Sequence, residues 1–149
     1  MKRIFLLFFL VGILVVSGCT NGNVVMDPEK RITVYKSASC GCCSGYVAEL
    51  KRQGFNVETV LREDMFSIKN QYNIPKNMES CHTSVIGNYF IEGHVPIEAV
   101  NMLLESKPEI DGIALPNMPA GSPGMPGFKS EPFKIYALTN GEVSEFMSV

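Results

Sequence analysis

The residues best suited to chemistry are cysteines and a histidine, gathered in two short segments. Three thiols occur within four residues at Cys40, Cys42 and Cys43, and a fourth stands beside an imidazole at Cys81-His82. Thiolates bind Cu(I) and Zn(II), and they also exchange disulfides. The residue types therefore predict a metal site or a redox site, provided that the fold brings two distant segments together.

The elements expected around these cysteines belong to an α/β fold. In chain order, we expect a strand at 31–35, a helix from about Cys43 to Gly54, a strand at 55–60, a short helix at 65–72, a hairpin at 83–86 and 89–91, and a helix from Pro96 to about Glu105. This order is that of thioredoxin and glutaredoxin, in which a central mixed sheet is flanked by helices. The active cysteines of that fold follow the first strand, as Cys40–Cys43 do here.

The rest of the chain predicts a long irregular loop and a closing hairpin. Residues 116–127 contain four prolines and three glycines, together with Met118 and Met125, and cannot form regular structure. Two β-rich runs, 133–138 and 142–146, flank Asn140-Gly141 and are expected to pair. In the helix that follows Pro96, we expect Met102 to face the core.

The N-terminal residues are typical of an export signal. A positive start at Lys2-Arg3 precedes an apolar run, which ends in Val16-Ser17-Gly18-Cys19 and resembles a bacterial-type lipobox. We expect a signal peptide at 1–18, a lipid on Cys19, a tether at 19–30 and a metal-binding domain at 31–149. This places the protein outside the cytoplasm, anchored to a membrane and facing the periplasm or cell exterior. An uncleaved anchor helix is the alternative.

Charge argues against a nucleic-acid partner. Removal of residues 1–18 takes away Lys2 and Arg3, so that 11 basic residues (13 − 2) face 15 acidic ones, a formal charge of −4. No basic run remains that could bind a phosphate backbone. The expected partners are therefore metal ions, a membrane through the lipid, and other metal-handling proteins.

The spacing of the thiols discriminates between redox and metal chemistry. Cys40 and Cys43 have the Cys-x-x-Cys spacing of a redox pair, but Cys42 adds a third thiol that invites wrong pairing. His82 precedes Thr83, at the place where the thioredoxin fold usually keeps a cis-proline that shields the site from metal. Both departures favour a metal site.

The same donors bear on which metal is bound. Cys40, Cys43, Cys81 and His82 could form a closed zinc site, but Cys42 would then be left over. Neighbouring ligands are better suited to bridging several ions than to chelating one, and thioethers at Met118 and Met125 favour Cu(I). We therefore expect several Cu(I) ions, with zinc as the alternative.

Several motifs resemble those of the CopG-type copper-resistance proteins, which are exported thioredoxin-like proteins with a CxCC motif. They are Cys40-Gly-Cys-Cys43, Ser80-Cys-His-Thr83, Ile91-Glu-Gly-His-Val-Pro96 and Met118-Pro-Ala-Gly-Ser-Pro-Gly-Met125. The resemblance implies a multinuclear copper site on Cys40, Cys42, Cys43 and Cys81, with copper redox chemistry as a further implication. It extends over about residues 31–139.

We therefore expect a protein that holds Cu(I) in a thiolate cluster, for copper tolerance or for copper redox cycling as an oxidoreductase. One alternative is a thiol-disulfide oxidoreductase that uses Cys40 and Cys43, with Cys81 as resolving thiol. Another is a zinc-stabilised interaction module. A copper exporter is a candidate partner. His94, in a turn before a helix, is predicted to be a surface or capping residue.

Overall fold

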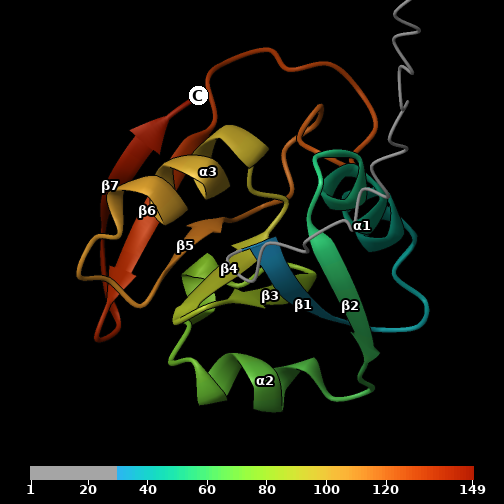
Figure 1. Cartoon of the computed structure of the whole chain (residues 1–149), viewed down its shortest axis with the longest axis horizontal. Coiled ribbons are helices and arrows are strands. Elements are labelled where there is room, and N and C mark those ends of the chain that lie inside the picture. Colours follow the sequence, from blue (N-terminus) through green and yellow to red (C-terminus); the bar gives the residue numbers. More distant parts are fainter. Residues whose placement is uncertain (1–29) are drawn as a thin grey trace, which may run out of the picture.

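The computed structural model describes residues 30–149, so the expected signal peptide, the lipid-bearing Cys19 and all but the last residue of the tether lie outside the described residues. Within residues 30–149, no helix is long and apolar enough to cross a membrane. The elements, shown in Figure 1, are β1 (Arg31–Lys36), α1 (Gly41–Arg52), β2 (Asn56–Leu61), α2 (Met65–Gln71), the 3-10 helix η2 (Lys76–Met78), β3 (His82–Ile86), β4 (Tyr89–Gly93), α3 (Ile97–Ser106), β5 (Gly112–Leu115), β6 (Lys134–Thr139) and β7 (Glu142–Ser148).

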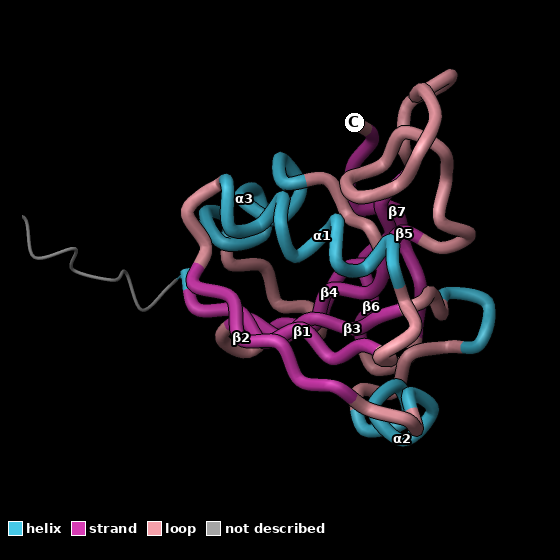
Figure 2. Tube along the Cα trace, turned by 90° about the vertical axis from the view of Figure 1, so that its right-hand side faces the viewer, coloured by secondary structure: helices cyan, strands magenta, loops and turns pink. Residues whose placement is uncertain are grey.

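The strands form one mixed sheet in the order β2-β1-β3-β4-β5-β6-β7. β1 pairs with β2, and β4 with β5, in parallel, whereas the other neighbours are antiparallel. Helices α1 and α3 cover one face of the sheet and α2 lies on the other, as the two views in Figures 1 and 2 agree. The predicted α/β architecture, a central mixed sheet flanked by helices, is confirmed. The thioredoxin-like assignment stays an interpretation of the element order.

The main apolar core lies between the sheet and helices α1 and α3. It includes Ile32 and Val34 from β1, Leu50 from α1 and Leu103 from α3, all fully buried. A smaller cluster around Phe90 fills the α2 side. Because successive side chains of a strand point to opposite faces, β3 and β4 contribute to both sides of the sheet.

Most of the predicted elements are present. Helix α1 begins at Gly41, earlier than expected, and the closing hairpin is confirmed, with positive φ at Asn140 and Gly141. Strand β5 was not predicted because its four residues are all buried and show no alternation of polar and apolar side chains. The prediction for Met102 is wrong: the residue is 45% exposed, because it lies on the outer face of α3.

Candidate metal centre

The start of α1 positions the first three cysteines. Cys40 is the N-cap residue, with an extended backbone, and the helix begins at the next residue. Cys42 and Cys43 therefore lie in the first turn, where the backbone N–H groups have no partner within the helix. Cys43 is fully buried, whereas Cys40 and Cys42 are partly exposed. The predicted location, between a strand and a helix N-terminus, is confirmed.

Two of these cysteines are joined in the structure. A disulfide links Cys40 to Cys43, and Cys42 and Cys81 are free thiols. The free sulfurs lie close to the bridge: Cys42 Sγ is 3.6 Å from Cys40 Sγ, and Cys81 Sγ is 3.5 Å from Cys43 Sγ. The pairing is the one that the redox alternative predicts. Binding of a metal by all four cysteines therefore requires that this disulfide be reduced first.

Strand β3 and the residue before it contribute Cys81 and His82. Cys81 lies in a bend and β3 begins at His82, so the two side chains do not alternate as they would within a strand. Both reach the α1 side, where Cys81 Sγ is 3.4 Å from His82 Nδ1. The His82 ring is fully buried, with its centroid 4.7 Å from that of Tyr46.

The prediction for His94 is wrong, because the residue is fully buried beside the cysteines. Its Nε2 lies 3.1 Å from Cys81 Sγ, and its Nδ1–H donates a hydrogen bond of 2.7 Å to the carbonyl of Pro123. The hairpin register could have revealed this position. Thr83 pairs with Glu92, so continuing the antiparallel register places residue 94 opposite residue 81.

Burial controls the protonation of the donors. It lowers the pKa of His82 to about 3, with further lowering by His94, Lys69 and Lys36, and it also lowers the pKa of His94. Both imidazoles are therefore neutral at pH 7, the form that binds metal. Burial, and then the neighbouring Cys42, raises the pKa of Cys81 to about 12, so its sulfur is protonated until a cation displaces the proton.

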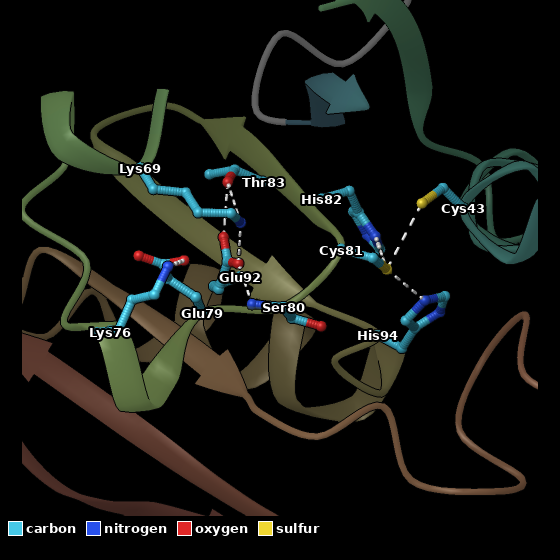
Figure 3. Close-up of polar contacts among 10 residues, drawn as sticks. All are labelled: Cys43, Lys69, Lys76, Glu79, Ser80, Cys81, His82, Thr83, Glu92 and His94. Atoms are coloured by element: carbon cyan, nitrogen blue, oxygen red, sulfur yellow. Dashed lines mark hydrogen bonds and ion pairs between the residues drawn. The ribbon is translucent and has the colours of Figure 1, made fainter. Parts of the chain in front are cut away.

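These donors form two overlapping groups that share Cys43 and Cys81. Figure 3 shows Cys43, His82 and His94 around the sulfur of Cys81. One group is Cys40, Cys42, Cys43 and Cys81, and the other is Cys43, Cys81, His82 and His94; within each, the ligand atoms lie within 4.8 Å of one another. In addition, His82 Nε2 is buried and has no hydrogen-bond partner among residues 30–149. Sulfur and imidazole donors fit soft or borderline cations, and the shared Cys43 and Cys81 fit bridging between ions.

The loop between β5 and β6 reaches this centre through its middle. Pro123 accepts the hydrogen bond from His94, and Gly124 lies against the first turns of α1. A Cβ on Gly124 would be 2.4 Å from the backbone nitrogen of Tyr46, so only glycine allows this approach. Met118, which is 38% exposed, and the half-buried Met125 flank this contact in the sequence, and their role as ligands stays a prediction.

The fold and the site define a class: a mixed α/β protein with a sulfur- and imidazole-rich cluster at the start of a helix, of a composition that can hold metal. The chain belongs to the CopG-type copper-resistance protein family. It is 36% identical to two solved structures, "Copper resistance protein copG- Form 1" and "Copper resistance protein copG- Form 2", with TM-scores of 0.73 and 0.74. Each alignment covers 80% of this chain, and 96% and 97% of the respective relatives.

A family model described as "Protein of unknown function, DUF411" matches residues 78–125. This segment contains Cys81, His82 and His94, together with the loop that contacts α1. No curated protein matches the chain. The predicted family is thus confirmed, whereas the individual ligands remain predictions that rest on the geometry above.

Proposed function

We propose that this protein binds Cu(I) in a multinuclear thiolate cluster and thereby serves copper tolerance. The observation that carries the proposal is the convergence of four cysteine sulfurs and two imidazoles from three separate segments of the chain. Membership of a family whose solved relatives are named copper resistance proteins supports copper as the metal.

The proposed ligands are the sulfurs of Cys40, Cys42, Cys43 and Cys81, with the imidazoles of His82 and His94 at the buried side. Thiolates favour Cu(I) over harder cations and can bridge neighbouring ions, which agrees with two donor groups that share two sulfurs. Met118 and Met125 are proposed as additional thioether ligands. Cycling between Cu(I) and Cu(II) is a further proposed activity of the same centre.

A Cu(I) titration of the full-length protein tests the proposal. The protein is reduced to open the Cys40–Cys43 disulfide, transferred to an anaerobic buffer and titrated with Cu(I) against a chromogenic Cu(I) chelator. We expect several copper ions per chain and thiolate-to-copper absorption in the ultraviolet. If the protein binds no Cu(I) but holds one zinc ion per chain, the result supports the zinc-stabilised module instead.

The substitution Cys42→Ser separates a cluster from a dithiol. Cys42 is a free thiol and takes no part in the Cys40–Cys43 disulfide. If the centre is a cluster, the variant should bind fewer copper ions than the parent, because one bridging sulfur is lost. Unchanged stoichiometry in Cys42→Ser would contradict a cluster that includes this residue.

Thiol-disulfide exchange is the second candidate function. It is favoured by one observation, the Cys40–Cys43 disulfide with the free Cys81 Sγ 3.5 Å from Cys43 Sγ. Insulin reduction by the metal-free protein, with Cys43→Ser as the inactive control, tests this activity. Activity in a protein that binds no copper would replace the copper proposal.

We further propose that the protein is exported and anchored through a lipid on Cys19, with a copper exporter as a candidate partner. The lipobox-like end of the apolar run supports this location. Mass spectrometry of the membrane-extracted protein should show loss of residues 1–18 and a lipid on Cys19. The variant Cys19→Ser should lose the modification.

A further inference from the structure

A buried ion pair lies behind the metal centre, on the α2 side of the sheet. Glu92 in β4 has no exposed surface, Lys69 in α2 is 4% exposed, and the two form a salt bridge. Glu92 also accepts hydrogen bonds from the Thr83 hydroxyl at 2.6 Å and from the backbone N–H of Ser80 at 2.5 Å. One carboxylate therefore ties α2 and β3 to the segment that precedes Cys81 (Figure 3).

Glu92 and the two residues of the Ser80–Thr83 segment that donate to it are close in sequence to proposed ligands. Ser80 immediately precedes Cys81, Thr83 follows His82, and Glu92 itself is two residues before His94. The segment before Cys81 and the end of β4 are also packed tightly against each other, since a Cβ on Gly93 would be 2.6 Å from Ser80 Oγ. The carboxylate and this close packing together set the spacing between the Cys81 segment and the end of β4.

Stability alone does not account for the pair. Removing two charges from water is costly, and replacing a buried ion pair by apolar residues of similar volume is often neutral or stabilising. What an apolar pair cannot do is accept the N–H of Ser80 and the hydroxyl of Thr83. The polar contacts are therefore best explained by the geometry that they impose on β3 and β4.

We propose that Glu92, supported by Lys69, is a positioning residue for the metal centre. It holds the backbone on either side of Cys81 and His82 at the distance from His94 that metal binding requires. Glu92 acts from the opposite face of the sheet and does not contact the metal. The proposal rests on the proposed copper-binding function and adds a residue that controls the affinity of that site.

Two double variants test the proposal in the full-length protein. Lys69→Met/Glu92→Leu removes the charges and the hydrogen bonds to Ser80 and Thr83. Lys69→Met/Glu92→Gln removes the charges and the hydrogen bonds of Lys69 to Thr83 and Glu92, but residue 92 keeps its bonds to Ser80 and Thr83. The amide oxygen can accept from Ser80 N–H, and the amide N–H can donate to Thr83 Oγ1. Both are reduced and titrated with Cu(I) against the chelator, with their metal-free Tm recorded.

We expect the Leu variant to lose roughly 10–100-fold in Cu(I) affinity, as is typical when a residue that orients metal ligands is removed. Its thiolate-to-copper absorption should also change in position or intensity. The Gln variant should stay within about threefold of the parent. Phe90→Leu, on the same face of β4 and with an apolar side chain, is the control for general loosening, and its affinity per folded molecule should match that of the parent.

Parental affinity and an unchanged spectrum in both double variants would overturn the proposal. Equal losses in the Leu and Gln variants would also overturn it, because the hydrogen bonds of residue 92 to Ser80 and Thr83 would then not account for the loss. If the parent itself binds no Cu(I), the proposed function fails, and the positioning role is decided in metal-free protein by the alkylation rate of Cys81 with iodoacetamide. That rate should rise in the Leu variant and not in the Gln variant; equal rates would overturn the role.

Discussion

Cys81 is the residue around which the other donors are arranged. Its sulfur lies 3.5 Å from Cys43 Sγ, 3.4 Å from His82 Nδ1 and 3.1 Å from His94 Nε2. The hydrogen bond from His94 Nδ1–H to the Pro123 carbonyl fixes the tautomer of that ring, so that a lone pair on Nε2 faces Cys81. The protonation states of Cys81 and the two histidines therefore decide whether these atoms can bind a cation.

Cu(I) affinity should rise with pH. The pKa of Cys81 is raised to about 12, so a proton leaves this thiol when metal binds, whereas the two imidazoles, with lowered pKa values, have no proton to lose near pH 7. Between pH 6 and 8, the affinity should increase by about tenfold per pH unit for each thiol that is protonated in the free protein. Chelator competition at several pH values measures this slope, and a flat profile would show that the thiols are ionised before binding.

The metal-free, disulfide-bonded protein should lose stability in acid through His82. The pKa of His82 is lowered to about 3, so the unfolded state binds a proton that the folded state excludes, and stability falls as the pH drops from about 6.5 toward 3. The expected loss is roughly 3 kcal/mol between pH 7 and pH 4. Urea unfolding at these pH values measures it.

The matched variant for this prediction is His82→Asn, which has no group that titrates in the same range. Only the slope of the unfolding free energy with pH is compared, so the stability of the variant at pH 7 does not enter the result. The comparison also cancels the contributions of other buried groups, such as Glu92, whose pKa is raised by burial. Equal slopes in the two proteins would show that His82 is accessible to protons in the folded state.

Among the elements, helix α1 and the loop between β5 and β6 form the wall of the centre. Their backbones touch where Gly45 faces Gly124, and a Cβ on Gly45 would be 2.9 Å from Gly124 Cα. The same loop supplies the carbonyl that holds His94. The long irregular segment is therefore part of the site's structure, which explains why it is rich in glycine at the point of contact.

Gly124→Ala should displace this loop from α1. The new Cβ would meet the Tyr46 backbone nitrogen at 2.4 Å, and the residue has a φ of +81°, so both a clash and backbone strain oppose it. We expect a loss of about 2–4 kcal/mol in unfolding free energy and weaker Cu(I) binding. Urea unfolding and chelator competition measure the two effects.

Gly54→Ala is the matched control, because Gly54 has a φ of +84° but no atom within 4 Å of the new Cβ. It should cost only the backbone strain, about 1 kcal/mol, and leave Cu(I) affinity unchanged. If both alanine variants bind Cu(I) equally well, the loop does not contribute to the centre.

At the scale of the whole molecule, sheet topology assembles the donors. Strand β3 lies beside both β1 and β4, so the end of β1 that leads into α1 comes next to the start of β3 and the end of β4. The Cys40–Cys43 disulfide adds a second requirement for metal binding, because two of the four sulfurs can act as thiolate ligands only after the disulfide is reduced. Metal binding should therefore couple the redox state of the centre to the stability of the fold.

Cu(I) should stabilise the reduced protein much more than the disulfide-bonded one. A ligand present at 100 times its Kd adds about 2.7 kcal/mol to the unfolding free energy. For a domain of this size, that is roughly 10 °C in Tm. Thermal unfolding under anaerobic conditions, with and without Cu(I), measures the shift. The variant Cys40→Ser/Cys43→Ser is the control, and it should respond like the disulfide-bonded protein whether or not reductant is present.

The sequence by itself determined most of the element order and most of the candidate donor set. Local patterns were sufficient for the strand before Cys40, the helix after it and the hairpin at 83–86 and 89–91, because these depend on alternation, helical spacing and turn residues. The cysteine spacing indicated soft-metal or redox chemistry for the same reason: it depends on residue type and on neighbours in the chain.

The tertiary structure decided what depends on contacts between distant segments. The location of His94 follows from the antiparallel register that sets it beside Cys81, and its burial is not visible in the turn sequence around it. The Glu92 contacts to Ser80 and Thr83 arise across the same hairpin. Short-range patterns carry no information on which partners fill a buried space, so register and packing had to supply these residues.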